Sequence, residues 1–114
     1  MEIREELLEG DIYRISLDGR MDIEGVASIE KCFAELAGQP HERVAVDMSA
    51  VPYMSSIGIR ALLINAKAVS RRGGKYIILS PQPEVLDVLK VSGIDQLITI
   101  CADLDEAGKV LAGN

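Results

Sequence analysis

The sequence predicts an α/β fold: one domain over residues 1–114, with a mostly parallel mixed sheet, an antiparallel N-terminal edge strand and about four helices. Three observations favour it. Two strand-like segments open the chain and are joined by the turn residues Glu9-Gly10-Asp11, which is typical of a β-hairpin. Strand-like and helix-like segments then alternate, as in parallel sheets with helical crossovers. The 114 residues contain no repeat or linker and suit a single core.

The opening hairpin is expected to comprise residues Ile3–Leu8 and Asp11–Leu17. In the second segment the apolar residues Tyr13, Ile15 and Leu17 alternate with polar ones. They therefore share one face of a half-buried strand.

The first helix is predicted to begin at Ile23, because Asp22 is well placed to accept hydrogen bonds from the first free amides. Gly38 and Pro40 end this helix. Apolar residues recur along it at helical spacing, so one stripe packs inward. The stripe consists of Val26, Ile29, Phe33, Leu36 and Ala37.

A central strand over Val44–Met48 is predicted from its unbroken apolar start, which suits a strand covered on both faces. After a short turn, a helix is expected from Ser56 to Arg72. It carries more apolar residues than packing on one sheet would use. It is therefore either flanked by a second helix or offers part of its face to a partner. Its narrow polar edge consists of Arg60, Lys67 and Arg71.

The rest of the chain is predicted to contain a strand, a helix, a short strand and a terminal helix. The turn Gly73-Gly74-Lys75 leads from a helix into a strand, so it lacks the strand-to-helix order of a phosphate-binding P-loop. The predicted elements are the strand Tyr76–Leu79, a helix started by Pro81 and Pro83 and stopped by Ser92-Gly93, the strand Leu97–Cys101, and a helix capped by Asp103 that holds Leu104, Ala107, Val110 and Leu111.

The charge of the chain bears on its partners. The formal net charge is -6, whereas nucleic acids and anionic membranes attract basic surfaces. We therefore expect a protein partner, no nucleic acid and no membrane insertion. No segment approaches the roughly 18 to 20 apolar residues that span a bilayer, and the acidic amino terminus lacks the apolar run of a signal peptide. A cytoplasmic location is expected.

The two cysteines, Cys32 and Cys101, stand far apart in apolar stretches. Neither a CxxC pair nor a histidine cluster accompanies them, as a zinc site would require. We expect both to be reduced core residues, and we expect no metal and no cofactor.

Two serines, Ser55 and Ser56, lie where the turn after the central strand meets the following helix. The first N–H groups of a helix lack intrahelical partners and carry a partial positive charge, so phosphate oxygens are stabilised there. Gly58 follows closely, and its missing side chain is expected to leave room for a bulky group near the backbone. The simpler alternative is that one serine is only an N-cap, worth roughly 1 kcal/mol.

Catalytic signatures are weak in this sequence. The only histidine, His41, precedes the central strand and is expected at the opposite end of the sheet from the serines. No GxSxG motif surrounds either serine. Asp22 and Asp47 could meet at the serine end, but each is more often a cap or a strand-end hydrogen bonder. We expect no enzyme, and a small hydrolase using Ser56 is the least favoured function.

Four stretches, taken together, resemble the STAS domain, as found in bacterial anti-sigma factor antagonists. The run from Val44 to Ile59 resembles the signature of this family. The other three stretches fit in the expected order and extend the resemblance over nearly the whole chain. They are Leu17-Asp18-Gly19-Arg20-Met21-Asp22, which is similar to the family's L-x-G-x-[LI]-D turn, Gly73-Gly74-Lys75, similar to its helix-to-strand turn, and Val91-Ser92-Gly93-Ile94, similar to its SGL-like helix stop.

The resemblance implies a switch protein without catalysis of its own. In the family, an unphosphorylated antagonist binds an anti-sigma factor that is also a serine kinase, and thereby frees a sigma factor. Phosphorylation of a serine at the helix start dissociates the complex, and a serine phosphatase resets the cycle. The family's D-S-[SAT]-G motif implies phosphorylation of Ser56, with Ser55 as the second candidate. Ser55 stands in place of the family's acidic residue, and Ile57 in place of a small one.

The resemblance also implies that Asp22, in the loop beside the serines, belongs to the partner-binding surface. The residues expected with it there are Arg20, Met21, Tyr53, Met54, Ser55, Gly58 and Arg60. The missing acidic residue keeps a second function open. This is a non-switching STAS interaction module, such as a stressosome-like scaffold or the small subunit of a lipid-transport ABC system.

Overall fold

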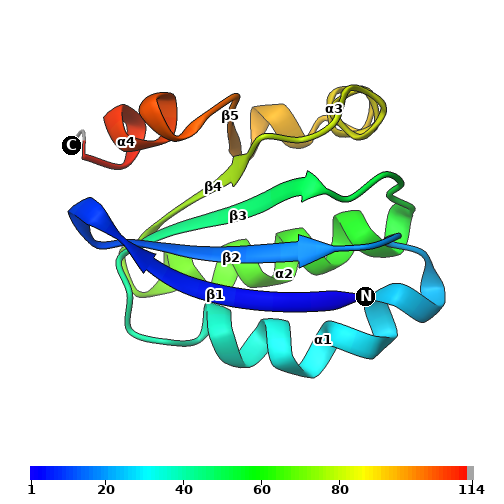
Figure 1. Cartoon of the computed structure of the whole chain (residues 1–114), viewed down its shortest axis with the longest axis horizontal. Coiled ribbons are helices and arrows are strands. Elements are labelled where there is room, and N and C mark those ends of the chain that lie inside the picture. The colour runs from blue at the N-terminus through cyan, green and yellow to red at the C-terminus, as the bar shows by residue number, and fades with distance from the viewer. Residues whose placement is uncertain (113–114) are drawn as a thin grey trace.

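In the computed structural model, which describes residues 1–112, five strands form one sheet in the order β1-β2-β3-β4-β5 (Figure 1). β1 pairs antiparallel with β2, and the other neighbouring strands pair in parallel. The predicted mostly parallel sheet with an antiparallel N-terminal edge is therefore confirmed. The strands are β1 (Glu2–Leu8), β2 (Ile12–Asp18), β3 (Arg43–Ala50), β4 (Lys75–Leu79) and β5 (Thr99–Cys101).

Four α-helices connect or follow these strands, as predicted: α1 (Ile23–Ala37), α2 (Ser56–Arg71), α3 (Pro83–Val91) and α4 (Leu104–Ala112). Two of the predicted caps are present. The Asp22 carboxylate accepts a hydrogen bond from the amide of Gly25 at 2.8 Å, and that of Asp103 accepts one from the amide of Glu106 at 2.9 Å. Each cap satisfies an amide that the helix itself leaves unpaired.

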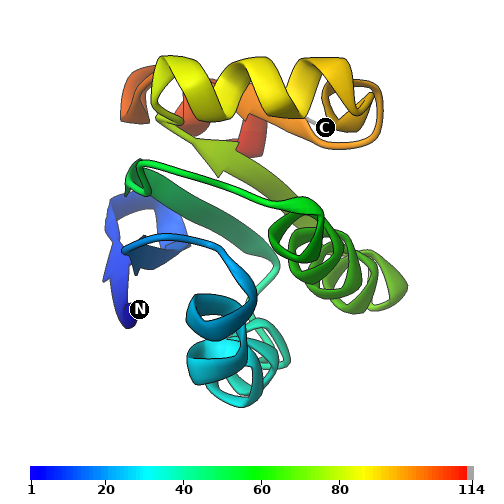
Figure 2. The ribbon, with the colours of Figure 1, turned by 90° about the vertical axis from the view of Figure 1, so that its right-hand side faces the viewer.

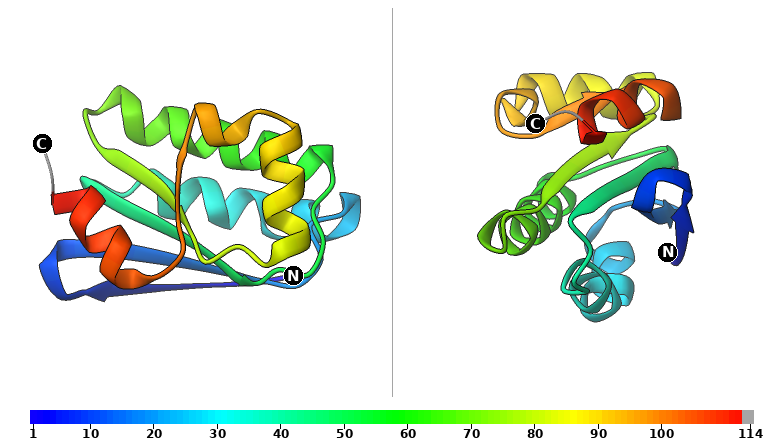
Figure 3. Two further views of the ribbon diagram at one scale, coloured as in Figure 1. Left: turned by 90° about the horizontal axis from the view of Figure 1, so that it is seen from above. Right: turned by 90° about the vertical axis from the view of Figure 1, so that its left-hand side faces the viewer.

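Helices lie on both sides of the sheet (Figures 2 and 3), and buried side chains form a core on each of its faces. Side chains of α1, α2 and α3 pack in the larger core, and α4 packs in the smaller one. β3 lies in the middle, with Val44, Ala45 and Val46 fully buried. Val44 and Val46 point into the larger core and Ala45 into the smaller, so the strand is covered on both faces, as its unbroken apolar sequence predicted.

The end of the sheet differs from the prediction. Leu97 and Ile98 do not belong to β5, which contains only Thr99–Cys101. The amide of Ile98 donates at 2.8 Å to the carbonyl of Ile94, the first residue of a 3-10 turn (Ile94–Gln96) that the sequence did not reveal. Because the turn uses this amide, it cannot join the ladder with β4. Leu97 is 71% exposed.

The two cysteines are in different environments. Cys101 is buried, as predicted, and its burial raises the pKa of the thiol, which the nearby carboxylates of Glu106 and Asp103 raise further. Cys32 is exposed, so the expectation of a core residue was wrong. Cys32 lies between the buried residues Ile29 and Phe33 but faces outward from the stripe that they form. Both thiols are free.

The surplus of apolar residues on α2 has two structural outcomes. α1 packs beside α2, so the helix is flanked, as one of the two predicted alternatives required. Ile57 and Ile64 nevertheless remain 38% and 51% exposed. Among the helices of residues 1–112, none combines the length and the apolar character that crossing a bilayer requires.

Candidate partner-binding site at the N-terminus of α2

The loops that follow β2 and β3 are joined by backbone hydrogen bonds beyond the end of the sheet. The amide of Met21 donates to the carbonyl of Tyr53 at 2.9 Å, and the amide of Ser55 donates to the carbonyl of Met21 at 3.0 Å. Met21 and Met54 thus form an isolated parallel bridge. The bridge fixes the loop before α1 against the loop before α2, so both helices begin at the same end of the molecule.

The two serines have different roles at the start of α2. Ser55 occupies the N-cap position in an extended conformation, but its side chain makes no capping hydrogen bond. Its hydroxyl instead donates to the carbonyl of Met21 at 2.8 Å. Ser56 is the first residue of the helix and is exposed, even with the larger Ile57 beside it. The expected alternative of a serine side-chain cap therefore does not hold for Ser55.

The first turn of α2 keeps its positive character. It contains no acidic residue, and the N-cap side chain leaves its amides unbonded. In α1, by contrast, the carboxylate of Asp22 is bound to the first turn. An anion placed on Ser56 would therefore meet unneutralised N–H groups at a helix end.

Arg20 connects the two loops through its side chain. Its guanidinium carbon lies 4.3 Å from the centre of the Tyr53 ring, and its Nε lies 3.6 Å from a carboxylate oxygen of Asp22. All three side chains are well exposed at this end of the molecule. Arg20, Asp22 and Tyr53 thus form a polar and aromatic surface on the two joined loops. That this surface binds a partner stays a prediction.

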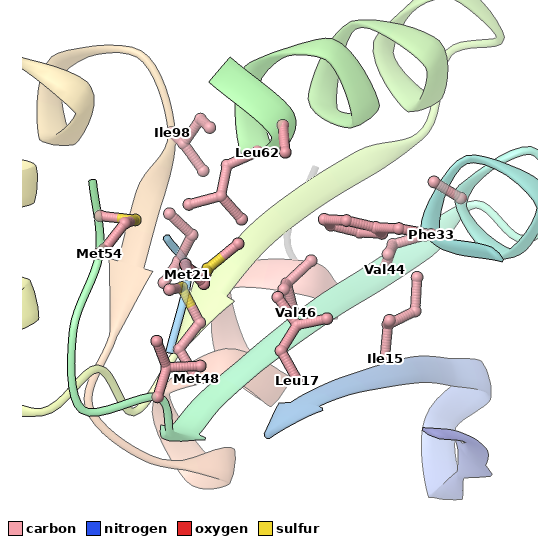
Figure 4. Packing of buried hydrophobic residues seen from close by; sticks show 14 of the residues in the cluster. Ile15, Leu17, Met21, Phe33, Val44, Val46, Met48, Met54, Leu62 and Ile98 are labelled. Carbon is pink, nitrogen blue, oxygen red and sulfur yellow. The ribbon is translucent and has the colours of Figure 1, made fainter. Parts of the chain in front are cut away.

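Three residues of that list have a different role, because they are buried. Met21 is fully buried and Met54 is 3% exposed. Figure 4 shows Met54 on the strand-to-helix loop and Met21 in the core beneath it. A Cβ on Gly58 would lie 2.7 Å from Cγ of Met54 and 3.0 Å from Cβ of Met21. The space beside Gly58 is filled by methionines and is not open to a bulky group, which corrects the expectation from the sequence.

Arg60 lies on α2 four residues after Ser56 and is exposed. Residues at this spacing are neighbours on a helix surface. Within residues 1–112, Arg60 belongs to none of the ion pairs. A cation is therefore available one turn from the exposed serine.

The groups that a hydrolase would need are dispersed. His41 stacks on the Tyr13 ring with a centroid distance of 4.0 Å, and β3 separates it from the serines, as predicted. Asp47 accepts a hydrogen bond from the amide of Ser49 at 2.9 Å, while Asp22 caps α1. Asp47 lies between Val46 and Met48 on β3 and points to the opposite face. The suggested meeting of Asp22 and Asp47 is therefore not found.

The sequence reasoning missed Gly25. A Cβ at this position would lie 2.0 Å from the carbonyl oxygen of Arg20, so only glycine lets the loop fold back over the start of α1. A glycine in the first turn of a helix, three residues after the cap residue Asp22, was the available signal, because glycine is otherwise unfavourable inside a helix.

The fold and the site together are those of a small α/β domain that presents two joined loops and a helix N-terminus at one end. A family model described as the STAS domain matches residues 8–107. The chain belongs to the STAS domain family, which confirms the resemblance carried by the four sequence stretches.

Known proteins similar to this chain include regulators of sigma factors. BtrV of Bordetella bronchiseptica, provisionally assigned as an anti-sigma factor antagonist, is 30% identical over 84 residues, which cover 71% of this chain and 72% of BtrV. A Thermotoga maritima protein with the same provisional assignment has a TM-score of 0.87 at 18% identity, covering 97% of this chain and 95% of that one. The phosphorylated form of the Bacillus cell fate determinant SpoIIAA has a TM-score of 0.68 at 19% identity, covering 96% and 99%. At these identities the two solved structures show the shared fold.

Proposed function

We propose that the chain is a cytoplasmic anti-sigma factor antagonist, which binds a serine-kinase anti-sigma factor and is released when that kinase phosphorylates Ser56. The single observation that carries the proposal is the contrast between the two serines. Ser56 is exposed at an open helix N-terminus, whereas the hydroxyl of Ser55 is bonded to Met21. The provisional assignment of BtrV as an antagonist supports the same function.

The physical basis of the switch is a difference in how the charge is accommodated. A phosphate on Ser56 would add about -1.5 to -2 charge at neutral pH. In the isolated chain the open first turn of α2 and the nearby cation of Arg60 stabilise that charge. A partner surface packed against a neutral hydroxyl would have to desolvate it. Because a loss of about 1.4 kcal/mol weakens binding tenfold, a modest desolvation penalty is enough for release.

The partner-binding surface in this proposal surrounds Ser56 on the described structure. Arg20, Asp22, Tyr53 and Arg60 supply exposed side chains. Met21, Met54 and Gly58 support that surface from the core. The joined loops need no rearrangement to accept a phosphate, so the fold is expected to stay the same after modification.

The test is incubation with the cognate anti-sigma factor kinase and ATP, followed by mass spectrometry. We expect one phosphate on Ser56, none in the Ser56→Ala variant, and normal modification of the matched Ser55→Ala variant. Ser56→Glu should lose kinase binding by tenfold or more, while Ser56→Ala retains it. A serine phosphatase should restore binding of the phosphorylated chain.

Two results would contradict this function. If the kinase leaves the chain unmodified and the Ser56→Glu variant binds the partner as tightly as the parent chain, the protein is instead a non-switching interaction module. Co-purification with the ATPase subunit of a lipid-transport system would identify one such module. Hydrolysis of a generic ester that disappears in Ser56→Ala would favour the hydrolase.

A further inference from the structure

The solvent-facing side of α2 carries a regular row of side chains that starts directly beside Ser56. Its members recur at spacings of three and four residues, so they share one face of the helix. We name this row the α2 stripe. It consists of Ile57, Arg60, Ile64, Lys67 and Arg71, all of which are exposed.

The charge of the stripe is opposite to that of the whole chain. α2 contains three basic residues and no acidic one, whereas the chain has a formal net charge of -6. The ion pairs found within residues 1–112 involve Arg4, Arg14 and Arg20, and none of the cations of α2. No ion pair among the described residues therefore neutralises the positive charges of the stripe.

The two isoleucines of the stripe lie seven residues apart, which corresponds to two turns of the helix. Ile57 and Ile64 are 38% and 51% exposed. Ile23, the first residue of α1, is 69% exposed and lies at the same end as Ile57, because the Met21–Met54 bridge joins the loops before these helices. Apolar side chains two turns apart, flanked by charges, suit contact with a second helix laid alongside.

We propose that the α2 stripe is a docking surface for an amphipathic helix with acidic side chains beside its apolar ones, supplied by the anti-sigma factor. The identity of that partner rests on the function proposed above, but the chemistry of the helix rests on the stripe. Opposite charge along the α2 stripe guides the encounter and fixes the register of the bound helix, and the isoleucines lose exposed area on contact.

Charge also argues against the other occupants of such a surface. A second copy of the chain docked stripe to stripe would place three cations against three cations. An anionic membrane would meet the basic stripe but would be repelled by the net charge of -6 on the whole chain. The proposed occupant is therefore an acidic amphipathic helix, whose side chains can pair with the three cations of the stripe.

The stripe and the switch are separate parts of one interface. Ser56 lies outside the stripe, and Arg60 is the residue through which the two adjoin. Phosphate on Ser56 would compete with an acidic partner side chain for Arg60. Release is therefore expected to begin at the N-terminal end of α2, while Lys67 and Arg71 determine which partner helix fits.

The test uses two designed amphipathic helical peptides as probes, with identical leucine positions and either glutamate or lysine on the flanks. The nitrogen-15-labelled chain is titrated with each peptide and followed by NMR. We expect the glutamate peptide to shift the amide signals of residues 57–71, and the lysine peptide to leave them unchanged. The Ile64→Ser variant and the double variant Lys67→Glu/Arg71→Glu should each lower the affinity for the glutamate peptide by roughly fivefold to tenfold. This is the size expected for the loss of one apolar contact or of two charge contacts.

Matched controls come from α3, where Val91 is 91% exposed and Lys90 is also exposed. Val91→Ser and Lys90→Glu repeat the same chemical changes on another helix and should leave peptide binding unchanged. The inference would be overturned if these control variants lowered the affinity for the glutamate peptide as much as the stripe variants do, or if the chain bound both peptides equally well. The inference would also be overturned if the parent chain self-associates in sedimentation experiments, or binds phosphatidylserine vesicles, and the stripe variants abolish that association or binding.

Failure of the inference can be distinguished from failure of the proposed function. If the cognate kinase phosphorylates Ser56 and binds the stripe variants as tightly as the parent chain, the switch stands and the acidic-helix docking is wrong. If the glutamate peptide binds the stripe but no kinase modifies Ser56, the docking chemistry stands, whereas its assignment to a kinase fails together with the proposed function.

Discussion

The carbonyl oxygen of Met21 accepts two hydrogen bonds from Ser55, one from its amide at 3.0 Å and one from its hydroxyl at 2.8 Å. This double contact joins the loop before α1 to the start of α2 across 34 positions of sequence. It also explains why a serine can occupy the position before Ser56: its short side chain reaches back to the loop instead of capping the helix.

Replacing Ser55 with alanine should lower the free energy of unfolding by about 1 kcal/mol, because the hydroxyl bond is lost while the amide bond remains. Urea denaturation measures this difference. The matched change Ser56→Ala removes an exposed hydroxyl for which no hydrogen bond is found in residues 1–112 and should stay within about 0.5 kcal/mol of the parent. Equal losses from both variants would show that the Ser55 hydroxyl does not hold the loops together.

Gly25→Ala should destabilise the chain by roughly 2 to 3 kcal/mol, because the added Cβ would lie 2.0 Å from the backbone carbonyl of Arg20. Gly108→Ala is the control, since a Cβ there meets nothing within 4 Å in the middle of α4. It should stabilise the chain by about 0.5 to 1 kcal/mol through helix propensity. Thermal and urea unfolding of both variants test the opposite signs.

Ser56→Glu should stabilise the isolated chain by about 0.3 to 1 kcal/mol at low salt, because a negative charge favours a helix N-terminus. High salt should remove the gain. Arg60→Ala should reduce it by roughly 0.2 to 0.5 kcal/mol, the size of a pair spaced four residues apart on a helix. A double-mutant cycle with urea unfolding measures this coupling, and a destabilising Ser56→Glu would contradict the idea of an open helix end.

Tyr76→Phe should stabilise the chain by about 1 kcal/mol at neutral pH, because the Tyr76 hydroxyl is buried without a hydrogen-bond partner in residues 1–112. The exposed Tyr53→Phe is the control and should be close to neutral, since the ring that faces Arg20 is kept. The stability of both variants follows from urea unfolding.

The pH dependence gives a second readout on Tyr76. Burial raises the pKa of its phenol above the ordinary value of 10.0, so the folded chain keeps it neutral where the unfolded chain ionises it. Below pH 10.0 this difference costs nothing, and above it the parent loses stability as pH rises. The advantage of Tyr76→Phe over the parent should therefore widen under alkaline conditions. An advantage that narrows as the pH rises would contradict a buried neutral phenol.

The mostly parallel character of the sheet, its antiparallel N-terminal edge and the helix caps were predictable from local patterns. Alternation along β2, the unbroken apolar start of β3 and the carboxylates of Asp22 and Asp103 each determine structure within a few residues. The position of the serines at the beginning of α2 followed from the same logic. It agrees with the structure, in which Ser56 is the first helical residue.

The rest of the site depends on contacts between distant segments, which periodicity does not reveal. The missing side chain of Gly58 suggested open space beside the backbone, but Met54 and Met21 fill that space. The hydroxyl of Ser55 is engaged by a carbonyl from another loop. Ile98 was assigned to a strand because it is apolar, yet a preceding 3-10 turn uses its amide.

The bridge between Met21 and Met54 is made of main-chain atoms, which are the same whatever residue occupies those positions. The exposed neighbours Arg20, Tyr53 and Arg60 can therefore be exchanged without disturbing the frame that carries them. Under the proposed function, related domains could differ in these side chains and so bind different partners, while every copy folds in the same way.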